Sequence, residues 1–248
     1  MNIGRYKVDP FFIIIILLFA FSNLSYYFNV PGALLGLILS IPGVLIAITF
    51  HEYAHAWMAD RLGDDTPRRE GRLSLNPLKH MDPIGILMLL FVGFGWGRPV
   101  SINPVNFNRT ISIRKANALV AFAGPAMNFI LAIVFSIIYA VYLAFGGTFL
   151  FTDVGNIIET IIISIISMNI GLGVFNLIPL PPLDGSKILV AFLPTNARNW
   201  VESHEHILYL VFILIWVTPI STYIISPFIH MISEWLVNLI VFIVGLLT

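Results

Sequence analysis

The sequence predicts an all-α polytopic membrane protein with about six transmembrane helices. Of its 248 residues, 58% are hydrophobic and only 10% are charged, and the mean hydropathy is +0.92, values that exclude an ordinary soluble domain. Apolar segments long enough to cross a bilayer cover residues 11–29, 33–59, 116–146, 156–180, 206–226 and 228–247. We therefore expect a single multi-pass domain over residues 1–248, located in the cell membrane.

The positions of the 13 lysines and arginines agree with this layout. They precede the first segment, or lie between the second and third or between the fourth and fifth. None lies in the opposite loops near residues 30, 147–155 and 226. Because basic loops stay in the cytoplasm, six spans with both termini on the cytoplasmic side are expected. The first apolar segment lacks a small-residue cleavage site and is interpreted as an uncleaved span.

The piece between the second and third spans is the only sizeable extramembrane region. Its apolar stretch at residues 84–96 is too short and too rich in glycine for a span, and is interpreted as re-entrant. The sequence GRPVSINPVNF that follows alternates apolar and polar residues between glycine and proline, which favours a short edge strand. We expect a small membrane-associated β and re-entrant region here.

The sequence HEYAH, residues 51–55, lies inside the second apolar segment. Two histidines four residues apart share one face of a helix. A carboxylate directly after the first histidine, here Glu52, can reach a water on the same metal, as in zinc peptidases. Ionisable groups are costly inside a bilayer, so three together indicate a function. The chain has no cysteine, so His51 and His55 need a third ligand that is His, Asp or Glu.

Asp184 is the candidate for that third ligand. The fourth span ends on the cytoplasmic side in FNLIPLPPLDG, where three prolines break the helix. Asp184 follows directly and is expected at the depth of the two histidines. An alternative role for this aspartate is the N-cap of a helix that starts at Gly185.

Three further polar residues have two interpretations each. Asn128 follows Gly124-Pro125 at the start of the third span, where its amide can bond a substrate or an oxyanion, or bond another helix. Asn176 has the same two interpretations. His80, in LKHMDPIG, is either a group of the metal site or an interfacial histidine.

Together, the motifs resemble the site-two protease family of intramembrane zinc metalloproteases, in its minimal prokaryotic form without PDZ or CBS domains. The family patterns HExxH, GPxxN and N-x-x-P-x-P-x-x-DG are matched by HEYAH, GPAMN and FNLIPLPPLDG, within residues 31–190. The resemblance implies one zinc ion held by His51, His55 and Asp184, with Glu52 as general base and Asn128 contacting substrate or oxyanion. It implies a three-helix catalytic core over residues 31–190, with accessory spans at 11–29 and 206–247.

The resemblance thus predicts hydrolysis of peptide bonds within or near transmembrane segments of membrane-protein substrates. The expected partners are such a protein or peptide and the lipid bilayer, with no nucleic acid, and the sequence carries no signal for an oligomeric state. Two other classes are a divalent-metal transporter, because intramembrane His and Asp also mark ion paths, and a non-catalytic homologue that binds membrane proteins. Clustering of the polar groups at one depth disfavours transport, and Glu52 disfavours the non-catalytic class. His230 and Glu234, four apart in the last segment, are interpreted as a local pair.

Overall fold

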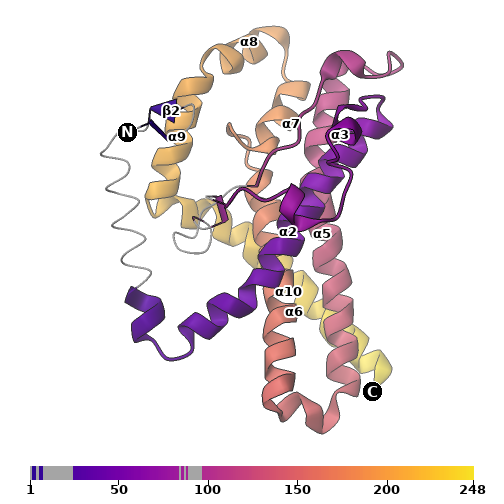
Figure 1. Ribbon diagram of the computed structural model, residues 1–248, viewed down its shortest axis with the longest axis vertical. Coiled ribbons are helices and arrows are strands. Elements are labelled where there is room, and N and C mark those ends of the chain that lie inside the picture. The colour runs from indigo at the N-terminus through magenta and orange to yellow at the C-terminus, as the bar shows by residue number, and fades with distance from the viewer. Residues whose placement is uncertain (1, 4–5, 8–24, 84, 87, 89–96) are drawn as a thin grey trace.

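The computed structural model is helical and is built around four long helices (Figure 1). It describes residues 2–3, 6–7, 25–83, 85–86, 88 and 97–248. Within these residues α2 (Ala33–Arg61), α5 (Ile113–Phe145), α6 (Asp153–Asn176) and α10 (Ile220–Leu247) are long and apolar enough to cross a membrane. Each of α2, α5 and α6 packs against the other two, and α10 crosses α5 and α6 obliquely.

Short elements precede or connect the long helices. In the described part of the chain they are β1 (Asn2–Ile3), β2 (Tyr6–Lys7), α3 (Thr66–Arg69), η1 (Pro77–Lys79), η2 (Pro104–Asn106), η3 (Gly147–Phe151), α7 (Asp184–Phe192), α8 (Thr195–Ser203) and α9 (Glu205–Val217). Both α5 and α6 begin at a side-chain cap: the Ser112 hydroxyl accepts from Lys115 N–H, and the Thr152 hydroxyl accepts from Gly155 N–H. Such caps satisfy backbone donors that have no partner within the helix.

The predicted spans at 33–59, 116–146 and 156–180 are confirmed as α2, α5 and α6, with ends that differ by a few residues. Most of the predicted span at 11–29 and most of the re-entrant stretch at 84–96 lie outside the described residues. The predicted edge strand is not confirmed, since residues 98–103 carry no strand and only an isolated bridge joins Met81 to Gly97.

The boundary between the last two predicted spans lies at a different residue from the one expected. The chain breaks at Thr218-Pro219, whereas Pro227 lies inside α10. A proline disfavours the helical conformation in the residue before it, and Thr218 is extended, with ψ 161°. Helix α9 consequently has 13 residues and a length of about 20 Å, short of the hydrocarbon thickness of about 30 Å. A count of six full spans is therefore not confirmed.

Close contact between α2 and α6 determines where the HEYAH turn lies. A Cβ atom on Gly43 of α2 would lie 2.5 Å from the Ser164 hydroxyl oxygen of α6, so only glycine allows this approach. On the other side of α6, an apolar core joins α5, α6 and α10 through Ala132, Ile162, Ile166, Ile170, Val174, Ile225 and Leu236. Helix α2 is thereby held against both α5 and α6.

A buried carboxylate just beyond α2 holds the segment that returns over the site. Asp64 is fully buried and accepts hydrogen bonds from the backbone and hydroxyl of Thr66, from the Asn103 N–H and from the Asn106 amide. Burial alone would raise the pKa of the Asp64 carboxyl, but these hydrogen bonds outweigh it and the pKa is lowered. Asp64 therefore ties residues 97–107 to the end of α2.

Asp64→Ala is expected to loosen this segment, because it leaves buried donors without an acceptor, at a cost of about 1–3 kcal/mol per group. The measurement is thermal unfolding in detergent together with the rate of proteolysis within residues 97–107. Asp65→Ala is the matched control, since the Asp65 carboxylate is about half exposed and, among the described residues, forms an ion pair with Arg69 alone. Equal losses in the two variants would contradict the role given to Asp64.

Candidate metal centre

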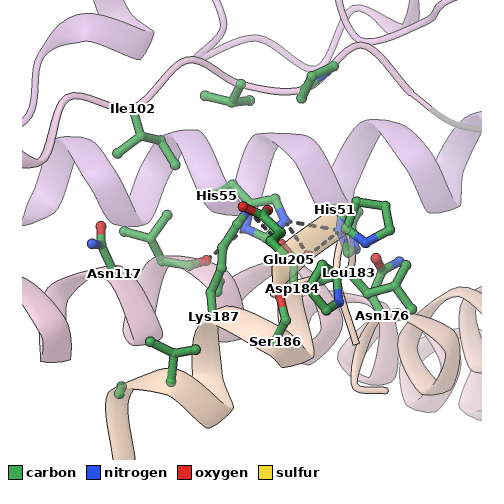
Figure 2. A pocket seen from close by; sticks show the side chains of 18 of the residues that line it. His51, His55, Ile102, Asn117, Asn176, Leu183, Asp184, Ser186, Lys187 and Glu205 are labelled. Atoms are coloured by element: carbon green, nitrogen blue, oxygen red, sulfur yellow. Dashed lines mark hydrogen bonds and ion pairs between the residues drawn. The ribbon is translucent and has the colours of Figure 1, made fainter. Parts of the chain in front are cut away.

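Three side chains from two helices meet at one point (Figure 2). His51 and His55 lie one turn apart on α2, and Asp184 is the first residue of α7; all three are buried. The two imidazole Nε2 atoms are 3.0 Å apart, and they lie 3.2 Å and 3.0 Å from Asp184 Oδ2. Zinc with bonds of about 2.0–2.2 Å in a tetrahedron separates its ligand atoms by about 3.3–3.5 Å. The three donors therefore fit a zinc ion after a small expansion.

Helix α5 orients both imidazoles through hydrogen bonds to their Nδ1 atoms, which point away from the centre. His51 Nδ1 lies 2.6 Å from Asn128 Oδ1, and His55 Nδ1 lies 2.7 Å from the Val120 carbonyl oxygen. Both oxygens are acceptors, so each Nδ1 carries the proton and donates it. Each Nε2 then presents its lone pair to the centre, which is the arrangement that a metal-binding histidine needs.

The orientation of Asn128 is itself determined by two acceptors. Its Nδ2 donates to the Ala47 carbonyl oxygen at 3.1 Å and to Asn169 Oδ1 at 2.9 Å, so its own Oδ1 must face His51. Asn169 in turn donates to the Ile165 carbonyl oxygen. Asn128 and Asn169 are both fully buried. The polar atoms of Asn128 are thus used within the protein, behind a candidate ligand, and Asn169 extends the network into α6.

The glycine of the GPAMN sequence leaves room for the two imidazoles. A Cβ atom on Gly124 would lie 2.4 Å from His55 Nε2 and 2.7 Å from His51 Cε1. These distances are far below van der Waals contact, and the backbone of α5 can approach the imidazoles only because residue 124 has no side chain. Pro125 follows in the helix and lacks the N–H that would bond the Ala121 carbonyl oxygen.

A tight turn after α6 brings Asp184 to the histidines. The N-cap of α7 is Leu183, which makes no side-chain cap bond, so Asp184 does not serve as the N-cap. A Cβ atom on Gly185 would lie 2.3 Å from the Leu177 carbonyl oxygen, so the turn closes against the end of α6. The second carboxylate oxygen, Asp184 Oδ1, lies 3.3 Å from Lys187 Nζ, which leaves Oδ2 for the centre.

The centre opens into a cavity of about 840 Å³. Its lining comes from α2, from the segment after Gly97, from the start of α5, from the end of α6 and from α7 to α9, and includes Glu52, Asn176 and Lys187. Figure 2 shows Asn176 and Lys187 on opposite sides of the histidines. Glu52 Oε2 accepts a hydrogen bond from the Val100 N–H at 3.2 Å. The Asn176 amide donates to the Leu172 carbonyl oxygen and lies at the cavity wall.

Two predicted candidates lie away from the cavity wall. Asn128 does not line the cavity, and neither does His80. His80 is fully buried, with Nε2 2.6 Å from the Ser74 carbonyl oxygen, and its own carbonyl oxygen accepts from Arg98 N–H. His80 therefore supports the segment that passes over Glu52.

Comparison with known proteins agrees with the geometry of the centre. The model of peptidase family M50 matches residues 150–218. A Bacillus subtilis protein named "Putative zinc metalloprotease YwhC" is 37% identical over 187 residues, which cover 75% of this chain and 84% of that protein. The chain belongs to peptidase family M50. The family match and the name of this relative place the M50 chain among the zinc metalloproteases.

More distant relatives of this M50 peptidase have similar names. A Mycolicibacterium smegmatis protein named "Putative zinc metalloprotease Rip2" is 29% identical over 73% of this chain and 68% of its own length. A Methanocaldococcus jannaschii protein named "Putative zinc metalloprotease MJ0611" is 26% identical over 67% of this chain and 77% of its own length. No solved structure matched the chain significantly.

Gly124→Ala is expected to destroy metal binding in this M50 peptidase, because the added methyl group overlaps both imidazoles. The measurement is the zinc content of protein purified in detergent, by mass spectrometry of the metal. Gly171→Ala is the matched control, because a Cβ atom at this helical glycine meets nothing within 4 Å. Zinc retained at the wild-type level in Gly124→Ala would contradict the packing described here.

Asn128→Leu is expected to weaken zinc binding by about 10–100-fold, the range found when a partner of a ligating histidine is lost. The physical reason is that His51 Nδ1 loses its acceptor, so the ring is no longer held with Nε2 toward the centre. Competition with a chelator measures the affinity. Asn169→Leu acts one step further away and should weaken binding less. An unchanged zinc affinity in Asn128→Leu would be inconsistent with this role.

Proposed function

We propose that the protein is an intramembrane zinc metalloprotease that hydrolyses peptide bonds within or near the transmembrane segments of membrane proteins. The observation that carries this proposal is the convergence of His51 Nε2, His55 Nε2 and Asp184 Oδ2, beside Glu52, at the wall of one cavity. The convergence lies within a group of membrane-length apolar helices. A substrate of matching chemistry is therefore a transmembrane helix that enters from the bilayer.

The centre would hold one zinc ion per chain, with its opening toward the cytoplasm. His51 and His55 lie in the last three turns of α2, and Arg61, Arg68, Arg69 and Arg72 follow shortly after. The excess of basic residues at this end supports a cytoplasmic orientation, with both termini on the same side. The cavity rim also carries charged groups, including Lys187 and Arg198.

Bound zinc supplies Lewis-acid activation of water and of the scissile carbonyl group. Glu52 is the general base, because it lies next to His51 and reaches the same cavity. The Val100 N–H holds Oε2 of this carboxylate, and Oε1 remains to take a proton from water and pass it to the leaving amine. The hydrogen bond from Val100 also fixes the direction of the carboxylate.

The polar contact to the substrate is assigned to Asn176. The family resemblance implied that Asn128 contacts substrate or oxyanion, but the hydrogen bonds of Asn128 to His51, Ala47 and Asn169 leave it behind the proposed metal ligands. Asn176 lies at the cavity wall beside the centre, and its single hydrogen bond leaves Oδ1 and one N–H for a substrate. A donor of this kind at a developing oxyanion accelerates acyl transfer.

The substrate must unwind before attack, because peptide groups in a transmembrane helix are bonded to one another. Residues 98–103 line one side of the cavity, and the N–H groups of Arg98, Val100 and Asn103 bind His80, Glu52 and Asp64. In an extended segment, residues two apart face the same edge, so Arg98 and Val100 anchor one edge of it. An unwound peptide can bind at the other edge, where Ser101 lies. Strand addition of this kind is the proposed way of presenting the peptide bond.

Glu52→Gln is expected to abolish cleavage while zinc stays bound, because the amide cannot accept the proton and the three ligands are intact. The measurement is cleavage of a panel of tagged single-span membrane proteins in detergent, with metal analysis of the same samples. Glu70→Gln removes the same charge at an exposed position and serves as the control.

Continued cleavage by the Glu52→Gln variant would overturn the assignment of the base. Loss of zinc together with activity would instead give Glu52 a role in metal binding. Zinc flux into vesicles that persists in Glu52→Gln would favour the alternative of a divalent-metal transporter.

A further inference from the structure

Helix α10 carries three polar side chains in one row. His230, Glu234 and Asn238 follow one another at intervals of four residues, and all three are exposed. We call them the α10 stripe. With Ser233 and Val237 they line a shallow hollow of about 370 Å³. The hollow is separate from the active-site cavity, whose lining includes no residue of α10.

The α10 stripe faces away from the rest of the described protein. The opposite side of the helix packs against the core of α5 and α6 through Ile225, Ile229, Ile232, Leu236 and Leu239. Because successive residues in an α-helix are rotated by about 100°, the stripe lies about 180° from this apolar face. One face of α10 therefore packs against its own chain, and the opposite face carries the α10 stripe.

A polar line in this position is costly in a membrane. Helix α10 has 28 residues, and Glu234 is close to its middle. In a helix that crosses the bilayer, this residue lies deep in the hydrocarbon region, where an ionisable side chain is expensive and normally has a partner. The sequence suggested that His230 and Glu234 pair locally, but neither makes a hydrogen bond or ion pair with any residue that the structure describes. The local pair is therefore not confirmed.

We propose that the α10 stripe is a contact surface for a second copy of this chain in the membrane. The stripe is self-complementary, because histidine and asparagine provide donors and glutamate and asparagine provide acceptors. A two-fold axis along the membrane normal brings the same residues of two parallel α10 helices to the same depth. Across the axis, each His230 and the Glu234 of the other copy differ in depth by about 6 Å, one helical turn. Their side chains are long enough to meet across this offset. Ser233 is small and allows close approach.

Disulfide cross-linking in membranes tests this proposal, because the chain has no cysteine of its own. Val241→Cys continues the line of the stripe, and Phe242→Cys is the matched control, one residue further and about 100° around the helix. The two native side chains are equally exposed, at 65% and 64%. After oxidation of the full chain in membranes, Val241→Cys should move to twice the 27.7 kDa of the monomer. Phe242→Cys should stay at the monomer mass.

A second set of variants shows whether the polar side chains cause the contact. His230→Leu, Glu234→Leu and Asn238→Leu together, in the Val241→Cys background, should remove the cross-linked dimer, since leucine suits a lipid-facing position. Unchanged amounts of this chain in the membrane would exclude misfolding as the cause. Equal cross-linking of Val241→Cys and Phe242→Cys, no dimer from either, or an adduct with a different protein would overturn the proposal. A dimer that persists in the triple-leucine variant would overturn the role of the stripe.

Discussion

Two hydrogen bonds from α2 to α5 determine the chemistry of this protein. They run from His51 Nδ1 to Asn128 and from His55 Nδ1 to the Val120 carbonyl oxygen, and they leave both Nε2 atoms facing Asp184. Without them the imidazoles can rotate or change tautomer, and three ligand atoms no longer share one point. The contact requires that the backbone of α5 lie against the imidazoles, which Gly124 permits.

Much of the remaining fold maintains this contact. Gly43 lets α2 lie against α6, and the apolar core holds α5 and α6 to α10. Asn169 reaches from α6 to Asn128, so all three central helices take part in orienting one histidine. The segment after Gly97 is held by Asp64 and bonds Glu52, which connects the chain between α2 and α5 to the proposed base.

The sequence was sufficient to predict the features that depend on local spacing. HEYAH predicts two imidazoles on one helical face, and the prolines before Asp184 predict a turn that returns the chain to their depth. The other features of the site depend on how the helices pack against one another. No local pattern indicates that the Val120 carbonyl oxygen accepts a hydrogen bond from His55. Nor does any indicate that the Asn128 amide faces His51 while Asn176 faces the cavity. Asn169 gave no distinct signal, because α6 contains other polar residues, among them Asn156, Ser164 and Ser167.

The position of the break between α9 and α10 likewise could not be predicted from the local sequence alone. Pro219 and Pro227 are equal as helix breakers in the sequence, but packing against α5 and α6 keeps Pro227 inside α10. The extended segment after Gly97 likewise has the alternation of a strand. Its N–H groups bind His80, Glu52 and Asp64, which belong to other parts of the chain, so no ladder forms.

Anomalous X-ray diffraction at the zinc absorption edge, on crystals of the full chain, tests the central claim most directly. The account predicts one zinc peak per chain, bound by His51 Nε2, His55 Nε2 and Asp184 Oδ2 at about 2.0–2.2 Å, with Asn128 Oδ1 still bonded to His51 Nδ1. A peak at other residues, or a zinc ion bound through either Nδ1 atom, would contradict it.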